Sequence, residues 1–147
     1  MTEKTILIAD DDHELVHVLA VRCRRLGLNV LCAHDAFTSL SLVRTGRPDV
    51  VCLDVDMPAG NGLGVCEMLS SDAACRTIPI IILTGRTDPE TIMRCHSLCA
   101  YYVEKCADVW SRIEPLFKEL LGDLDTTSAS HPVESGGPAV HNSLHRG

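Results

Sequence analysis

Short apolar runs alternate with amphipathic stretches along most of the chain, and each run stops abruptly at a polar or charged residue. The runs are rich in Val and Ile, which is typical of parallel strands buried on both faces. The stretches between them repeat apolar residues at helical spacing. The sequence therefore predicts five strands, at Thr5–Ala9, Asn29–Ala33, Val50–Leu53, Ile78–Leu83 and Tyr101–Glu104.

The helical stretches between these strands have recognisable ends. Asp35 and Asp88 stand where an N-cap is expected, and Pro89 suits the first position of a helix. Gly27 is a suitable stop for the first helix. The expected helices cover about 13–26, 36–44, 63–70, 89–98 and 108–122.

Strands that alternate with helices through short links predict right-handed βαβ units and a doubly wound α/β fold. We expect a flavodoxin-like parallel sheet of five strands in the order 2-1-3-4-5 with five helices, which makes the first and third strands neighbours. Residues 1–122 would form this single domain. Residues 123–147 lack an apolar period and are rich in turn formers, so we expect a disordered tail there.

Composition and charge narrow the class of protein. The net charge is −7 and no Lys/Arg stripe is present, so we expect no nucleic-acid partner. No apolar stretch is long enough to span a membrane and no secretory signal is visible, so we expect a cytoplasmic protein without disulfides. Cys95, His96, Cys99 and Cys106 have ligand-like spacing, but without a Cys-x-x-Cys pair they do not favour zinc.

Reactive side chains follow the predicted strands. Three acids, Asp10, Asp11 and Asp12, come directly after the first strand, and Asp54 follows the third. The carboxyl ends of parallel strands meet at one edge, where clustered carboxylates repel unless a cation neutralises them. Mg²⁺ prefers such oxygen ligands. The sequence therefore predicts a divalent metal site at this edge, with Asp12 serving only as a helix cap.

The same edge has the groups needed for phosphoryl transfer. A carboxylate such as Asp54 can attack phosphorus and form an acyl phosphate, while a metal ion shields the two anions from each other. Lys105 after the fifth strand would add a positive charge for a phosphoryl oxygen, and Thr84 at the end of the fourth would add a hydroxyl donor.

Four motifs together resemble the receiver domain of two-component response regulators, over about Lys4 to Gly122. Each motif lies at the end of a predicted strand, and the set is far more specific than any one of them. The motifs are the residues 6–12 (ILIADDD), 53–58 (LDVDMP) with Asn61-Gly62, 83–85 (LTG) and 102–105 (YVEK).

This resemblance implies a role for each acidic residue of the edge. Asp54 would be the phospho-acceptor. The Mg²⁺ ligands would be Asp11, Asp54 and the backbone carbonyl of Asp56. Asp10 would act on the metal through a bound water or contact Lys105.

The resemblance also implies a switch and its partners. Thr84 would be the hydroxyl that moves to the phosphoryl group, and Tyr102 the aromatic residue that rotates inward behind it. The donor would be a phosphohistidine on a sensor histidine kinase or a histidine phosphotransfer protein. The fourth helix, fifth strand and fifth helix would bind a downstream protein target. We expect a stand-alone receiver without an output domain, and no enzyme beyond its own phosphorylation and dephosphorylation.

Two departures from the family pattern border the fifth strand. Lys105-Cys106 replaces a Lys-Pro pair whose peptide bond is typically cis, and the sequence leaves the isomer open. The glycine usual before this strand is missing, so we expect an unusual connection at 98–100. Asp56 and Arg86 should flank the phosphoryl group and tune its lifetime through water access, in a direction that the sequence does not give.

Other functions fit the sequence less well. The domain could be an adaptor that binds proteins without being phosphorylated. Asp54-Val55-Asp56 matches half of the signature of haloacid dehalogenase-type phosphohydrolases, but Met57-Pro58 breaks it and the strand is third rather than first. A flavodoxin would bind its phosphate at the first loop, where the acidic run would repel it.

Overall fold

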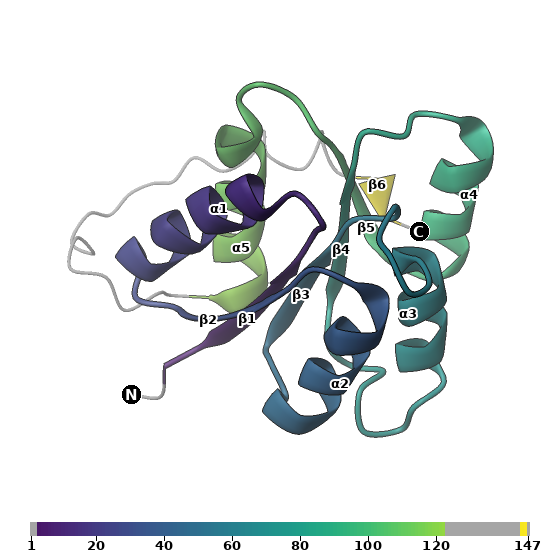
Figure 1. The fold of residues 1–147 in the computed structure, drawn as a ribbon, viewed down its shortest axis with the longest axis horizontal. Helices are drawn as coiled ribbons and strands as arrows, with labels where there is room; N and C mark the ends of the chain where they lie inside the picture. The colour runs from purple at the N-terminus through teal and green to yellow at the C-terminus, as the bar shows by residue number, and fades with distance from the viewer. Residues whose placement is uncertain (1–2, 123–144, 147) are drawn as a thin grey trace.

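Five apolar runs form the parallel strands of one sheet, in the order 2-1-3-4-5 predicted from the sequence (Figure 1). The computed structural model describes residues 3–122 and 145–146 of the chain. The parallel strands are β1 (Thr5–Ala9), β2 (Asn29–Ala33), β3 (Val50–Leu53), β4 (Ile80–Thr84) and β5 (Tyr101–Glu104). The helices are α1 (His13–Arg25), α2 (Ala36–Gly46), α3 (Gly62–Ser70), α4 (Pro89–Ser97) and α5 (Val109–Leu121).

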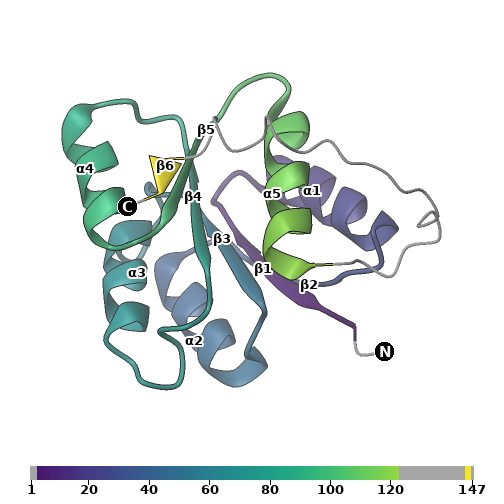
Figure 2. The same cartoon turned by 180° about the vertical axis from the view of Figure 1, so that it is seen from behind.

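Helices cover both faces of the sheet, so every central strand is buried on two sides (Figures 1 and 2). α1 and α5 lie on one face, and α2, α3 and α4 lie on the other. Alternate residues of β1 serve the two cores: Ile6 and Ile8 pack toward α1 and α5, whereas Leu7 and Ala9 pack on the opposite side. This double burial explains why the strands appear in the sequence as continuous apolar runs.

Most helices begin at the residues expected from the sequence. Asp35 caps α2 by accepting a hydrogen bond from Thr38 N at 2.6 Å, and Asp88 caps α4 through Thr91 N at 3.0 Å. Asn61 caps α3 in the same way. Within the described part of the chain, none of these helices has the length and hydrophobicity needed to cross a membrane.

The start of β4 was placed too early by the sequence analysis. The apolar run begins at Ile78, but the strand begins at Ile80 and continues to Thr84. Pro79 has no N–H to donate to a neighbouring strand. Its carbonyl oxygen still accepts a hydrogen bond from Val51 N at 3.1 Å, so the segment stays beside β3.

The register of the sheet aligns the strand ends that carry the polar residues. Ala9 at the end of β1 pairs with Leu53 at the end of β3. The next residues, Asp10 and Asp54, therefore leave the sheet side by side. β4 pairs with β3 on one side and β5 on the other, and Lys105 follows the end of β5.

Both connections of β5 depart from the pattern of the family that the sequence resembles. Cys99, in the expected unusual connection, has a φ of 60°, a backbone region that favours glycine. Cys99 N and Ala100 N donate hydrogen bonds to the last carbonyls of α4, at 3.0 and 2.9 Å. The Lys105–Cys106 peptide, whose isomer the sequence left open, is trans.

A two-residue strand, β6 (His145–Arg146), extends the sheet beyond β5 (Figure 2). It runs antiparallel to β5, with Tyr101 opposite Arg146 and Tyr102 opposite His145. The sequence analysis placed these two residues in a tail and expected no strand, because backbone pairing to a sheet edge leaves little mark on composition. The rest of that expected tail, 123–144 and 147, lies outside the described residues.

We expect Gly62→Ala to destabilise the fold, because α3 begins against the end of β3. A Cβ at this position would overlap the Asp54 carbonyl oxygen and lie 2.9 Å from its carbonyl carbon. The strand end cannot yield without disturbing the sheet, so the free energy of unfolding should fall by about 1–3 kcal/mol. Urea denaturation measures it.

Gly64→Ala is the matched control, because it lies in the same helix and its new Cβ would meet only Asn61 Oδ1, at 3.7 Å. Alanine is favoured over glycine inside a helix by about 0.5–1 kcal/mol, so this variant should be as stable as wild type or more so. Equal destabilisation by both variants would contradict the close approach at Gly62.

Candidate functional site

Two carboxylates are buried at the carboxyl edge of the sheet. Asp10 and Asp54 are 3% and 5% exposed. Their backbones continue the strand pairing by one residue: Asp10 N donates to Ala33 O at 3.1 Å, and Asp54 N donates to Ala9 O at 3.0 Å. The sheet itself therefore fixes where these two acids lie.

The Lys105 ammonium joins the two buried acids. Its Nζ lies 2.7 Å from Asp10 Oδ2 and 3.2 Å from Asp54 Oδ2. Lys105 N donates to Thr84 O at 2.9 Å, so its backbone is tied to the end of β4. The second oxygen of Asp54, Oδ1, accepts a hydrogen bond from Val55 N at 2.7 Å. Both oxygens of Asp54 are thus oriented by fixed donors.

The charges of this cluster are strongly coupled. Burial raises the pKa of the Asp10 carboxyl above its usual value, and the hydrogen bond from Lys105 works in the opposite direction. Burial disfavours the charged Lys105, but its hydrogen bonds with Asp10 and its attraction to both acids raise its pKa. Lys105 therefore stays protonated at neutral pH and compensates part of the negative charge.

A third acid, exposed Asp11, completes a candidate metal site. One carboxylate oxygen from each of Asp10, Asp11 and Asp54 can be chosen so that all three lie within 4.8 Å of one another. The group holds three carboxylates but one ammonium, which pairs with Asp10 and Asp54, so it keeps an excess of negative charge. Hard oxygen donors with partial exposure fit Mg²⁺, which binds a few carboxylates and retains several waters. The fourth acid of this group, Asp12, caps α1 through Leu15 N at 3.1 Å, as predicted.

Thr84 and Tyr102 meet at the backbone of Arg86. Thr84 is fully buried at the end of β4, and its Oγ1 accepts a hydrogen bond from Arg86 N at 3.2 Å. Tyr102 on β5 is 4% exposed, and its hydroxyl donates to Arg86 O at 2.6 Å. Burial raises the pKa of Tyr102, so the phenol remains a donor at neutral pH. The two expected switch residues are therefore connected through one peptide segment.

The Arg86 side chain reaches back over the end of β3. Its Nε lies 3.1 and 3.0 Å from the two carboxylate oxygens of Asp56, and its Nη2 lies 2.9 Å from Oδ1. Both side chains remain about half exposed. The two residues predicted to flank the phosphoryl group thus form a bidentate ion pair, and the Asp56 carboxylate is engaged by Arg86.

Two histidines near the acids were not singled out by the sequence analysis. Nδ1 of His34 lies 2.9 Å from the carbonyl oxygen of Asp10, and the His34 ring stacks on His13 with 3.6 Å between ring centroids. His34 follows β2 as Asp10 follows β1. The rule that strand ends share an edge could have found it, but a histidine lacks the charge that drew attention to the acids.

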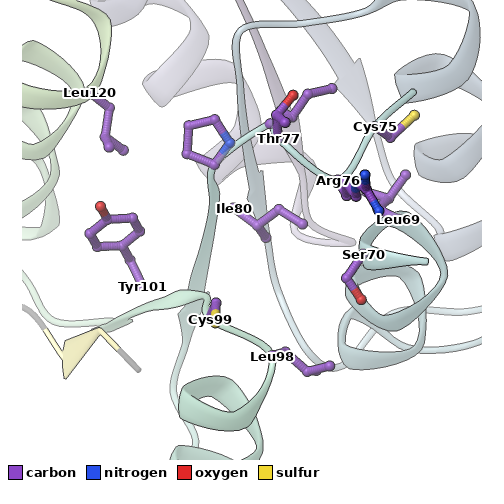
Figure 3. Close-up of a pocket in the computed structure, with 12 residues that line it drawn as sticks. Leu69, Ser70, Cys75, Arg76, Thr77, Ile80, Leu98, Cys99, Tyr101 and Leu120 are labelled. Atoms are coloured by element: carbon purple, nitrogen blue, oxygen red, sulfur yellow. The ribbon is translucent and has the colours of Figure 1, made fainter. Parts of the chain in front are cut away.

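A cavity of about 320 Å³ lies elsewhere, beside the amino ends of β4 and β5 (Figure 3). Its lining includes Ile80 and Tyr101, the first residues of those strands, and Leu120 of α5. Since parallel strands place their amino and carboxyl ends on opposite edges, this cavity is separate from the acidic cluster.

Comparison with known proteins agrees with the geometry. A family model described as the response regulator receiver domain matches residues 6–110. The chain is 31% identical to the DNA-binding response regulator MtrA of Mycolicibacterium smegmatis over 148 aligned residues, which cover 92% of this chain and 64% of MtrA. It therefore spans less than two thirds of the length of that relative.

Solved structures share the fold over nearly their whole length. The signal receiver domain of a DNA-binding response regulator from Colwellia psychrerythraea 34H has a TM-score of 0.74 and 28% identity, covering 81% of this chain and 98% of that one. The chemotaxis response regulator CheY4 of Vibrio cholerae has a TM-score of 0.73 at 22% identity, covering 81% and 99%. With the matched family model, these likenesses establish that the chain belongs to the response regulator receiver domain family.

Proposed function

We propose that this receiver accepts a phosphoryl group on Asp54 from a phosphohistidine of a sensor histidine kinase or a histidine phosphotransfer protein. The observation that carries this proposal is the Lys105 ammonium between buried Asp10 and Asp54. A lysine that only balanced charge could pair with one acid at the surface. Here it is held where an incoming phosphoryl oxygen would need a positive partner.

Each residue of the site has a separate role in the proposed phosphoryl transfer. An Asp54 oxygen attacks phosphorus and forms the acyl phosphate, while the bond from phosphorus to the histidine nitrogen breaks and its electron pair stays on the imidazole. Bound Mg²⁺ would neutralise the phosphoryl oxygens from a site made by Asp11, Asp54 and the Asp56 backbone carbonyl, with Asp10 acting through water. Lys105 binds a phosphoryl oxygen, and Val55 N–H keeps the carboxylate oriented.

The signal would leave the site through Thr84 and Arg86. Phosphorylation adds about −1.5 to −2 charges at neutral pH. A charge-assisted hydrogen bond from Thr84 contributes about 1.5–3 kcal/mol. If this hydrogen bond forms only in the active state, the population of the active state relative to the inactive state rises about ten- to a hundredfold. The Thr84 hydroxyl that would move to the phosphoryl group already accepts the N–H of Arg86, the residue whose carbonyl accepts a hydrogen bond from Tyr102.

The face formed by α4, β5 and α5 is the proposed output surface, which we call the output face. Tyr102 lies on its central strand and is bonded to Arg86 in the loop between β4 and α4. The proposed target is a protein. MtrA is described as DNA-binding, so the expectation that this chain meets no nucleic acid gains no support from that relative.

We expect intact wild-type protein to gain one phosphoryl group from phosphoramidate or acetyl phosphate in a Mg²⁺-dependent reaction. Asp54→Asn should gain none, because an amide oxygen is a poor nucleophile. Intact-mass spectrometry measures both. The fold should survive, since the change removes a charge rather than core packing.

Asp12→Asn is the matched control for this experiment. It makes the same substitution two residues from Asp10, and asparagine caps a helix as well as aspartate does. This variant should be labelled like wild type. Labelling of Asp54→Asn would contradict the assigned acceptor, and a wild type that binds Mg²⁺ without gaining mass would indicate a phosphorylation-independent adaptor.

Asp11→Asn should weaken Mg²⁺ binding, because it removes one of the carboxylates of the cluster. Loss of a residue that only supports a metal ligand typically weakens metal binding roughly 10–100-fold. Because Asp11 would be a ligand itself, we expect its loss to raise the Kd for Mg²⁺ by at least that factor. Calorimetric titration of the phosphate-free protein measures it, with Asp12→Asn again as control. Unchanged affinity would remove Asp11 from the site.

Thr84→Ala should still be phosphorylated, because Asp54 and Lys105 remain, but it should fail to switch. We expect the active population in the phosphorylated protein to fall about ten- to a hundredfold, since the hydroxyl contact is lost. Phosphorylation-induced changes in the NMR signals of β5 and α4 report this population. Thr84→Ser keeps the hydroxyl and should retain those changes; full switching by the alanine variant would refute the role of Thr84.

A further inference from the structure

β5 is the last of the parallel strands, so its outer edge has no parallel neighbour. β5 pairs with β4 along one side, so the backbone groups on its other side need another partner. Such an edge accepts an extended segment as an additional strand, recognised mainly through backbone hydrogen bonds. An edge of this kind can serve as a binding site without any pocket.

In this chain the edge is already occupied. Residues 145–146 pair with Tyr101 and Tyr102 as β6, and this short strand also contacts α4. Both views of the fold place it beside β5, on the side where α4 lies (Figures 1 and 2). The segment is distant in sequence from the strand that it pairs with, so tertiary docking rather than a hairpin brings it there.

We propose that the outer edge of β5 is a strand-addition site and that residues 145–146 are its internal occupant, which an external extended peptide must displace. The docking itself does not depend on phosphorylation. Only the description of this surface as the output face rests on the proposed function. The kind of partner that fits is an extended protein segment, since the edge offers backbone donors and acceptors in a row.

The occupied edge and the candidate site share one residue. Tyr102 is the register partner of His145, and its hydroxyl bonds to Arg86 O. Arg86 in turn holds Asp56 through its side chain. An occupant of the β5 edge therefore lies against the strand that the proposed switch uses. A short internal strand is suited to such a place because it covers the edge yet can be displaced by a longer segment.

The docking can be tested by amide hydrogen exchange, followed residue by residue by NMR on the full chain without phosphate. A variant carrying both His145→Pro and Arg146→Pro has no N–H at either position, whichever of them faces β5. We expect the edge amides of β5 to exchange roughly 5- to 30-fold faster in this variant. Amides of central β3 should be unchanged and serve as the internal reference.

The matched control replaces the same residues by alanine, which keeps both backbone N–H groups. It should protect β5 as wild type does. If the alanine variant loses as much protection as the proline variant, side chains hold the segment, and strand addition is refuted. Wild-type exchange rates in the proline variant would refute the docking.

Two further measurements decide who occupies the edge. Protection in the wild type should not depend on protein concentration; a loss on dilution would mean that the strand comes from a second copy, and would overturn the internal occupant. A synthetic peptide of residues 139–147 at millimolar concentration should restore slow exchange to the proline variant. No restoration would overturn the claim that the edge accepts an external strand.

Discussion

The rest of the structure depends on the ion cluster formed by Lys105 with buried Asp10 and Asp54. Two carboxylates removed from water repel each other unless a cation compensates them. Lys105 supplies that cation within 3.2 Å of both Asp10 and Asp54. It can do so only if β1, β3 and β5 end at the same level. The register of the sheet therefore determines whether the charges at its edge meet. A shift of one residue in the register of any of these strands would separate the charges.

Arg86 is the second organising residue, and it works through three different groups. Its N–H binds Thr84, its carbonyl binds Tyr102 and its guanidinium binds Asp56. The exposed ion pair contributes little to stability. Its consequence is positional, because it ties the loop after β4 to the loop after β3. A change at Asp54 thus has a short covalent and hydrogen-bonded route to β5.

Sequence reasoning succeeded wherever the signal is local or follows from topology. Periodicity located the strands, and the shared edge of a parallel sheet predicted that Asp10, Asp54 and Lys105 lie together. It failed where tertiary backbone geometry decides. β6 pairs through backbone groups, and neither the hydrogen bond from Tyr102 to Arg86 nor the one between His34 and Asp10 leaves a pattern in the chain. The predicted start of β4 was too early because Ile78, an apolar residue before Pro79, was counted as part of the strand.

The departures from the family pattern converge on β5. Cys99 takes a left-handed turn before the strand and Cys106 follows it, in place of the usual glycine and proline. The Lys105–Cys106 bond is trans, and yet Lys105 Nζ reaches both acids, because Lys105 N is fixed by Thr84 O before the chain turns away. The position of the Lys105 ammonium therefore depends on the pairing of β4 with β5 rather than on the residue after the lysine. The same strand carries Tyr102 and pairs with β6, so the departures from the family pattern lie around β5, whereas the acids at the ends of β1 and β3 match it.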